Sequence, residues 1–473
     1  MQKKVKIYFS INKNPKFNRI TQASWIFFKQ RIKNKDINIK IWWILSYFDN
    51  KVNSTVYVNL WQDIDNDILQ EFWAKWVKEA EKIQSWHDIN INLIFDSSIK
   101  KQQKYFIEKW ALLALKKDDE LMEKPNKNTT TIKNISNKEL ISIVSAINIA
   151  RELTYKPANI ITPNTVTNYV QDLFKNKIYI SIKILDDNDL KKENMNLFLA
   201  VWQWSTQKPK MLVMEYTPNL DKKASTTTNI DPIILIWKWL TYDSGWLYAK
   251  PYPYMNDMFG DMWWAATVIW IMSALQNLKI NKKIIWIIWL AENMPDGNAY
   301  KNWDIIKSKN GKSVYVWHTD AEWRLVLADM LAYAKDNYKA SLTLDFATLT
   351  WAAICATWEM YTAIFSDNNT LINKLNNTSK KTNDLVWNLP LDRYSKDAVK
   401  HKLADLSNTG KFRGILWAST AAAFLSNFVD DTQKWIHCDI AWPALRNEMR
   451  RSYDLPNGMG TWAMIHTILE HLK

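Results

Sequence analysis

The chain has 473 residues, of which 47% are hydrophobic and 23% charged, a balance typical of globular proteins and sufficient for two or three domains. This mixture excludes a disordered or fibrous protein. The net charge of +14 is compatible with nucleic acid or an acidic partner, but abundant Lys, Asn and Ile along the whole chain favour codon bias as its origin.

Along the chain, the first predicted elements are strands at residues 5–11, 56–60 and 89–94, with an amphipathic helix at residues 68–83. The polar stretch at residues 116–138 predicts a surface loop or a seam between domains. A second amphipathic helix is predicted at residues 138–155, and Pro157 and Pro163 end it.

Apolar strands then alternate with helices. Strands are predicted at residues 211–215, 233–240, 284–290, 341–349 and 436–440, with crossover helices such as 262–278 and 321–336. This order predicts an α/β fold, with a mostly parallel sheet flanked by helices in the C-terminal domain and a smaller α/β N-terminal domain. The predicted domains are residues 1–137 and 157–473, with a connecting helix at residues 138–156.

Tryptophan and glycine occur in abnormal numbers. The chain contains 28 tryptophans but only 8 glycines, although glycine ordinarily makes up roughly 7% of a protein. So few glycines cannot supply the left-handed turns and close backbone contacts that this length of chain needs. Together the two counts approach the ordinary share of glycine, so we hypothesise that many tryptophan positions are glycine in the source organism.

Targeting and disulfide signals are absent from the sequence. The segment MQKKVKIYFSINKNPK lacks the apolar core of a secretory signal, and the longest apolar runs, residues 41–48 and 263–275, are too short to span a bilayer. Cys355 and Cys438 cannot form a disulfide framework. The expectation is a cytoplasmic protein that does not bind to membranes.

Several enzyme signatures are also missing. The sequence contains no HExxH pair, no Walker loop and no GxSxG elbow, even when Trp is read as Gly. Its six histidines show no ligand spacing. A histidine-based zinc site is therefore not expected.

Several charged side chains instead lie where a predicted strand ends and a helix begins. In parallel sheets, ligand-binding sites lie at these carboxyl ends of the strands. These residues are Lys238, Asp243, Lys250, Asp261, Asp320, Glu322 and Arg324. Taken singly, they could be helix caps, dipole partners or surface lysines. Taken together, the carboxylates would repel one another unless cations neutralised them, so the group predicts two divalent metals and metal-assisted hydrolysis.

At these residues the chain resembles the leucyl aminopeptidase (cytosol aminopeptidase) family of dinuclear metallopeptidases. The resemblance runs from about residue 147 to the C-terminus and is most specific at HTDAEWRL. It also includes ARELTYKPANIITP, DFATLTWAAICATW, ADLSNTGKFRGILWASTAAAFL and WIHCDIAWPA. Residues 1–137 resemble the N-terminal domain of the family only loosely.

The resemblance explains the tryptophans. The positions where the family has glycine are Trp237, Trp239, Trp246, Trp263, Trp264, Trp303, Trp317, Trp323, Trp351 and Trp442. By contrast, Trp387 and Trp435 lie where the family tolerates tryptophan. The simplest hypothesis is a genome that reads the UGA codon as glycine. If position 323 were a true tryptophan, its indole would be expected to displace packed neighbours.

The resemblance implies five metal ligands, namely Lys238, Asp243, Asp261, Asp320 and Glu322. Asp243 and Glu322 would bridge two divalent cations. Asp261 and Lys238 would serve the tighter site, and Asp320 the more exchangeable one. Zinc and manganese are the first candidates, and magnesium and cobalt also suit these ligands.

The resemblance further implies removal of the N-terminal residue, with a leucine-like preference, from peptides with a free N-terminus. Water activated by the two metals would attack the scissile carbonyl. Lys250 would stabilise the oxyanion, and Arg324 would hold a bicarbonate that shuttles the proton.

Met258, Thr348 and Ala441 are weaker candidates for the substrate pocket, because core packing is the simpler role for each. His318 stands where the family has Asn, either as a hydrogen-bond donor behind the metal ligands or, as we favour, as a neutral variation. The family also implies a homohexamer.

Three alternatives stay open. A non-catalytic family member could bind DNA or serve as a scaffold, and its DNA affinity would fall steeply with salt. If the tryptophans are the true residues of the protein, the chain would be a decayed scaffold that folds poorly and binds no metal. Another metallohydrolase on a similar sheet is disfavoured by HTDAEWRL.

Overall fold

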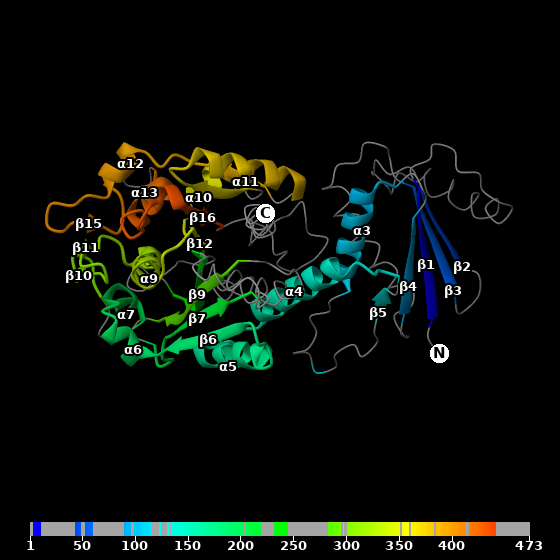
Figure 1. Cartoon of the computed structure of the whole chain (residues 1–473), viewed down its shortest axis with the longest axis horizontal. Coiled ribbons are helices and arrows are strands. Elements are labelled where there is room, and N and C mark those ends of the chain that lie inside the picture. The colour runs from blue at the N-terminus through cyan, green and yellow to red at the C-terminus, as the bar shows by residue number, and fades with distance from the viewer. Residues whose placement is uncertain are drawn as a thin grey trace, which may run out of the picture. The chain divides into compact units, whose positions relative to one another are not determined.

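The structure is a computed structural model of the chain, shown in Figure 1. It describes residues 3–10, 43–48, 53–59, 89–95, 99–115, 123, 130–132, 134–202, 205–218, 231–244, 282–294, 297, 300–350, 352–358, 361–382, 385–411 and 416–440. The chain divides into two compact units between Asn148 and Ile149.

The first unit contains a five-stranded sheet in the order β2-β3-β1-β4-β5. Its elements are β1 (Lys3–Ser10), β2 (Trp43–Phe48), β3 (Asn53–Asn59), β4 (Ile89–Phe95), α3 (Lys101–Ala114) and β5 (Thr130–Ile132). Neighbouring strands are parallel except β2 and β3. The strands predicted at residues 5–11, 56–60 and 89–94 are confirmed.

One prediction for this unit is corrected. The stretch at residues 116–138, predicted as a loop or seam, contains strand β5, whose residues pair with Ile89–Ile91 of β4. Three residues are too few to show the hydrophobic pattern of a strand. Their conformation depends instead on pairing with the neighbouring strand. The helix predicted at residues 68–83 lies outside the described residues.

The helix predicted at residues 138–155 is confirmed as α4 (Lys138–Tyr155). The division between the two units falls inside it. Helix α5 (Pro163–Phe174) follows, and its start is set locally. The hydroxyl of Thr162 accepts a hydrogen bond from the backbone N–H of Thr165 (3.2 Å), and Pro163 occupies the first helical position, which needs no N–H.

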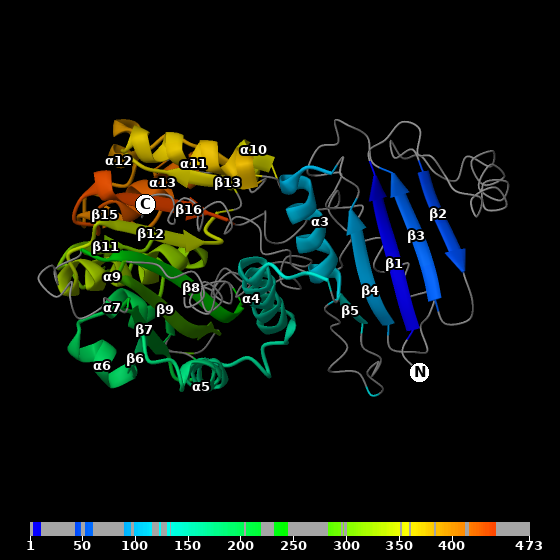
Figure 2. The same cartoon turned by 45° about the vertical axis from the view of Figure 1, so that its right-hand side comes forward.

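The second unit is built on an eight-stranded sheet in the order β14-β13-β16-β12-β8-β9-β7-β6 (Figure 2). Its strands are β6 (Ile180–Leu185), β7 (Lys210–Tyr216), β8 (Ile233–Asp243), β9 (Ile284–Asn293), β12 (Leu342–Ala347), β13 (Thr362–Phe365), β14 (Val386–Asn388) and β16 (Trp435–Asp439). The four central strands are parallel, as are β13 and β14, and the remaining pairs are antiparallel. The predicted α/β class and its five strands are confirmed.

A small sheet with the order β10-β11-β15 accompanies the large one. The remaining elements are α6 (Asp187–Lys192), α7 (Asn196–Trp202), β10 (Ile305–Lys307), β11 (Ser313–Tyr315), η3 (Thr319–Ala321), α9 (Trp323–Asn337), α10 (Ala352–Thr357), α11 (Asn369–Thr382), α12 (Arg393–Ala398), β15 (Leu406–Ser407), α13 (Trp417–Leu425) and η5 (Thr432–Lys434). The helix predicted at residues 321–336 is confirmed as α9, and the one predicted at 262–278 lies outside the described residues. Among the described helices, none has the length and apolar character needed to cross a bilayer.

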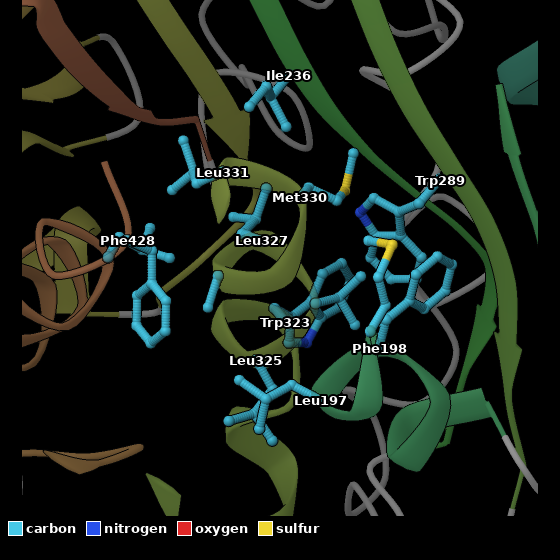
Figure 3. Packing of buried hydrophobic residues seen from close by; sticks show 14 of the residues in the cluster. Leu197, Phe198, Ile236, Trp289, Trp323, Leu325, Leu327, Met330, Leu331 and Phe428 are labelled. Carbon is cyan, nitrogen blue, oxygen red and sulfur yellow. The ribbon is translucent and has the colours of Figure 1, made fainter. Parts of the chain in front are cut away.

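Helix α9 is packed into the core of the second unit. Every residue from Trp323 to Ala334 is buried. Figure 3 shows Leu327 and Met330 of this helix between Phe428 on one side and Trp289 with Phe198 on the other. Burial along nearly its whole length holds α9 rigidly, so the residues at its N-terminus keep a fixed position relative to the sheet.

A buried carboxyl ties α9 to two other segments. Asp329 is fully buried, and its oxygens accept backbone N–H groups of Phe198 (3.1 Å) and Lys309 (2.8 Å). Burial raises the pKa of Asp329 to about 7, although these hydrogen bonds act in the opposite direction. The carboxyl therefore holds its proton more tightly in the folded chain than in the unfolded chain.

This shift predicts a pH-dependent stability. Because the folded pKa exceeds the unfolded one, the free energy of unfolding should fall as pH rises from about 4 to about 8. Urea unfolding of the wild type and of Asp329→Asn, measured at several pH values in this interval, checks the prediction. The variant cannot titrate at this position, so its pH slope should be flatter. An unchanged slope would contradict the role of Asp329.

Candidate active site

The predicted site residues divide into those that the structure describes and those that it does not. Side chains are described for Asp320, Glu322, Arg324 and Thr348. The backbone of Lys238 and Asp243 lies in β8, but their side chains are outside the described part, as are the following residues entirely: Lys250, Met258, Asp261 and Ala441.

Asp243 ends strand β8 at the carboxyl edge of the parallel strands. The register between β8 and β9 shifts between Leu240 and Asp243, after which Asp243 pairs with Asn293. The backbone N–H of Ser244 donates to the carbonyl of Asn293 (3.1 Å), so pairing continues past the irregularity. Such irregularities bend a strand and redirect its end, and they are common next to active sites.

Asp320 and Glu322 lie on one tight turn that leads into α9. Asp320 is half-buried within the 3-10 turn η3, and Glu322 is fully buried at the N-cap of α9. These two carboxylates, two residues apart at the start of a buried helix, carry the oxygen atoms that hard divalent cations prefer as ligands.

His318, for which the resemblance implies Asn, is the N-cap of this turn. Its Nδ1 accepts a hydrogen bond from the backbone N–H of Asp320 (3.2 Å). The Nδ1 of His and the Oδ1 of Asn are both bonded to Cγ, so either residue can accept this N–H. In this contact His318 is an acceptor rather than the donor considered from the sequence.

Arg324 is buried one residue into α9. Burial lowers the pKa of its guanidinium to about 10, and the charges of Asp439 and Glu322 oppose that shift. Within the described part of the chain, no acceptor bonds its Nε atom. A buried guanidinium with an unused donor is suited to hold an anion.

Asp439 belongs to this group but was missed from the sequence. It is buried at the end of β16, where it accepts the backbone N–H of Leu349 (3.0 Å) and the hydroxyl of Thr350 (2.6 Å). These bonds fix the segment after β12 that carries the half-buried Thr348. The rule that selected Asp243, a carboxylate at the end of a buried strand, would also have found Asp439.

Asn408 was missed as well. It is fully buried directly after β15 and bonds the turn that carries Asp320. It lies in ADLSNTGKFRGILWASTAAAFL, one of the segments that carry the family resemblance, but nothing in that segment indicates its contact with residue 317.

The structure describes part of the predicted metal site. Among the side chains that the structure describes, no group of three or more His, Cys, Asp or Glu residues could hold a metal ion. Of the five predicted ligands, only Asp320 and Glu322 have described side chains.

Comparison with known proteins identifies the family. Residues 148–467 match the family described as "Cytosol aminopeptidase family, catalytic domain". A probable cytosol aminopeptidase of Haemophilus influenzae (strain PittGG) is 38% identical over 303 residues, which are 64% of this chain and 60% of that protein. One of Persephonella marina is 38% identical over 297 residues, which are 63% of this chain and 58% of that protein. The chain thus aligns with about three fifths of the length of these relatives.

Solved structures share the fold over nearly the whole chain. A mutant of tomato leucine aminopeptidase matches with a TM-score of 0.83 and 22% identity, covering 99% of this chain and 94% of that one. The bottromycin maturation enzyme BotP in complex with Mn matches with a TM-score of 0.82 and 22% identity, covering 99% of both chains. The fold and the match over residues 148–467 show that this chain belongs to the cytosol aminopeptidase family.

Proposed function

We propose that this protein is a metal-dependent aminopeptidase that removes the N-terminal residue, with a leucine-like preference, from peptides. The observation that carries the proposal is the arrangement at the start of α9 in a chain of this family. There, half-buried Asp320, fully buried Glu322 and buried Arg324 follow one another on one rigid segment.

The described residues fit a pair of divalent cations in their chemistry. Carboxylate oxygens suit zinc, manganese, magnesium and cobalt, and zinc or manganese is proposed first. Asp320 and Glu322 would hold the ions together with Lys238, Asp243 and Asp261. When bound, two such ions supply the Lewis acidity that activates a water and polarises the scissile carbonyl.

The side chains of the chain supply the remaining functions. Lys250 is proposed to stabilise the oxyanion, and Arg324 to hold bicarbonate as the proton shuttle. The buried Nε of Arg324, which bonds no acceptor in the described part, supports an anion there. Thr348, on the segment that Asp439 fixes, is proposed to line the substrate pocket with Met258 and Ala441.

The activity is tested by mass spectrometry of peptides that begin with leucine. The protein should release leucine from a free peptide, leave the N-acetylated peptide intact, lose the activity after chelation and regain it with Mn²⁺ or Zn²⁺. Failure to cleave the free peptide would favour the non-catalytic alternative. Binding of DNA that survives the loss of Asp320 and Glu322 would point to that alternative directly.

Glycine at many tryptophan positions is proposed as well, and backbone geometry supports it at two of them. Trp303 has φ = 80° at the third position of a turn closed by the bond from the N–H of Asp304 to the carbonyl of Lys301 (3.1 Å). A turn of this form requires glycine or asparagine there. Trp358, directly after α10, has φ = 54°, a conformation that usually belongs to a glycine ending a helix.

Buried indoles give a second line of support. Within the described part of the chain, the indole nitrogens of Trp237, Trp286 and Trp289 are buried and bond no acceptor. Each such donor costs about 1–3 kcal/mol. Trp435, where the family tolerates tryptophan, instead donates to Asp345 (2.6 Å). Trp323 is also buried in the core, but its indole nitrogen is not among those that bond no acceptor, so it adds no argument of this kind.

Peptide mapping of the protein purified from its source tests this proposal. We expect glycine at positions 237, 303 and 358 and tryptophan at position 435. Tryptophan at position 303 would contradict the UGA hypothesis. The homohexamer rests on the family resemblance and stays a prediction, as does the cytoplasmic location expected from the sequence.

A further inference from the structure

The turn that carries Asp320 and Glu322 is held from outside by a side chain distant in the sequence. We propose that Asn408 is a positioning residue that fixes both carboxylates for metal binding, an inference that rests on the proposed metallopeptidase function. Asn408 contacts the backbone of the turn at both ends, and it acts on the metals only through that backbone.

The amide of Asn408 uses its full hydrogen-bonding capacity on this turn. Its Oδ1 accepts the backbone N–H groups of Trp317 (2.8 Å) and His318 (3.3 Å). Its Nδ2 donates to the carbonyls of His318 (2.7 Å) and Ala321 (3.4 Å). Only an amide side chain combines two acceptor sites with two donors in this way, and Asp would lose both donors while adding a buried charge.

The small sheet places Asn408 beside the turn. Leu406 and Ser407 of β15 pair in parallel with Val314 and Tyr315 of β11, and the N–H of Asn408 donates to the carbonyl of Tyr315 (3.0 Å). Asn408 is fully buried, so water cannot replace the lost partners if its side chain is removed.

Two other side chains support the same turn at single points. The hydroxyl of Tyr300, itself buried, donates to the carbonyl of Thr319 (2.6 Å), and His318 caps the N–H of Asp320. Asn408 is the one of these three that joins residues 317 and 321. All four of its bonds go to main-chain atoms, so they hold whether position 317 is tryptophan or glycine.

The test compares Asn408→Asp with Asn310→Asp. Asn310 is a suitable control because its amide also joins backbone segments: its Oδ1 accepts the N–H of Lys312 (3.3 Å), and its Nδ2 donates to the carbonyl of Asn427 (3.2 Å). It lies in the connection between β10 and β11, and its side chain bonds residues 308, 312 and 427 rather than the turn that carries the carboxylates. Mn²⁺ affinity by calorimetry, kcat, KM and urea unfolding are measured for each variant.

Asn408→Asp should weaken Mn²⁺ binding about 10- to 100-fold and lower kcat more than it changes KM. Asn310→Asp should leave Mn²⁺ affinity unchanged per folded molecule, even where it lowers stability. Equal Mn²⁺ affinity in the folded fractions of the two variants would overturn the proposal and leave Asn408 a purely structural residue.

Tyr300→Phe provides a milder second variant in case Asn408→Asp does not fold. It removes one hydrogen bond to the turn and keeps the ring, so Mn²⁺ affinity should fall about three- to tenfold. Unchanged affinity in this variant would also count against positioning of the turn. If the wild type binds Mn²⁺ but cleaves no peptide, the proposed function fails while the positioning role is still measured by affinity.

Discussion

Replacing Glu322 by glutamine is expected to lower the rate of peptide hydrolysis at least about a thousandfold. Glu322 is fully buried at the N-cap of α9, and its charge lies close enough to Arg324 to act on the pKa of that guanidinium. Glutamine keeps the size of the side chain but not its charge, so it would neither bridge two cations nor balance Arg324. Because the size is kept, the variant should fold. Because the charge is lost, it should bind less metal.

Glu215→Gln is the matched control for this experiment. Glu215 is a carboxylate on β7 that accepts the hydroxyl of Tyr338 (3.0 Å) and pairs with Lys283 (2.7 Å). It lies opposite Ile285 at the start of β9, which is the other end of the sheet from Asp243. Equal losses of activity in the two variants, or full activity in Glu322→Gln, would remove Glu322 from the catalytic site.

Replacing Asp345 by alanine is expected to lower the free energy of unfolding by about 3–5 kcal/mol. The carboxylate of Asp345 is fully buried on β12. Its Oδ1 lies 2.6 Å from Nδ1 of His437, and its Oδ2 accepts the indole N–H of Trp435 (2.6 Å). Alanine would leave both groups on β16 buried without a partner.

Asp345→Asn should lose less stability than the alanine variant. The amide oxygen can still accept the indole N–H of Trp435, and the amide nitrogen can donate to Nδ1 of His437 if the imidazole changes tautomer. Urea unfolding of the two variants beside the wild type measures this order. A loss below about 1 kcal/mol in Asp345→Ala would show that the three groups do not stabilise the sheet as a unit.

The large sheet was predictable because buried parallel strands read as continuous apolar runs, as in residues 233–237 and 284–290. The same reading placed Asp320 and Glu322 at a junction of strand and helix, and the structure brings them together on the turn before α9. Local sequence was sufficient there because both carboxylates belong to one short segment.

Contacts between distant segments explain what the sequence could not show. Asn408 lies 91 residues from Trp317, whose N–H it accepts, and nothing in its neighbours signals that contact. Strand β5 exists through its pairing with β4 and was therefore hidden in a polar stretch. The cap of His318 on Asp320 is instead a local contact, and it depends on which ring nitrogen faces the N–H two residues on, which the residue type alone does not reveal.

A crystal structure of the protein grown with Mn²⁺ and recorded with anomalous scattering would test the central claim most directly. The account predicts two anomalous peaks at the carboxyl edge of β8, with Glu322 in contact with both and Asp320 in contact with one. A single peak away from Glu322, or none at all in fully folded protein, would contradict the two-metal site.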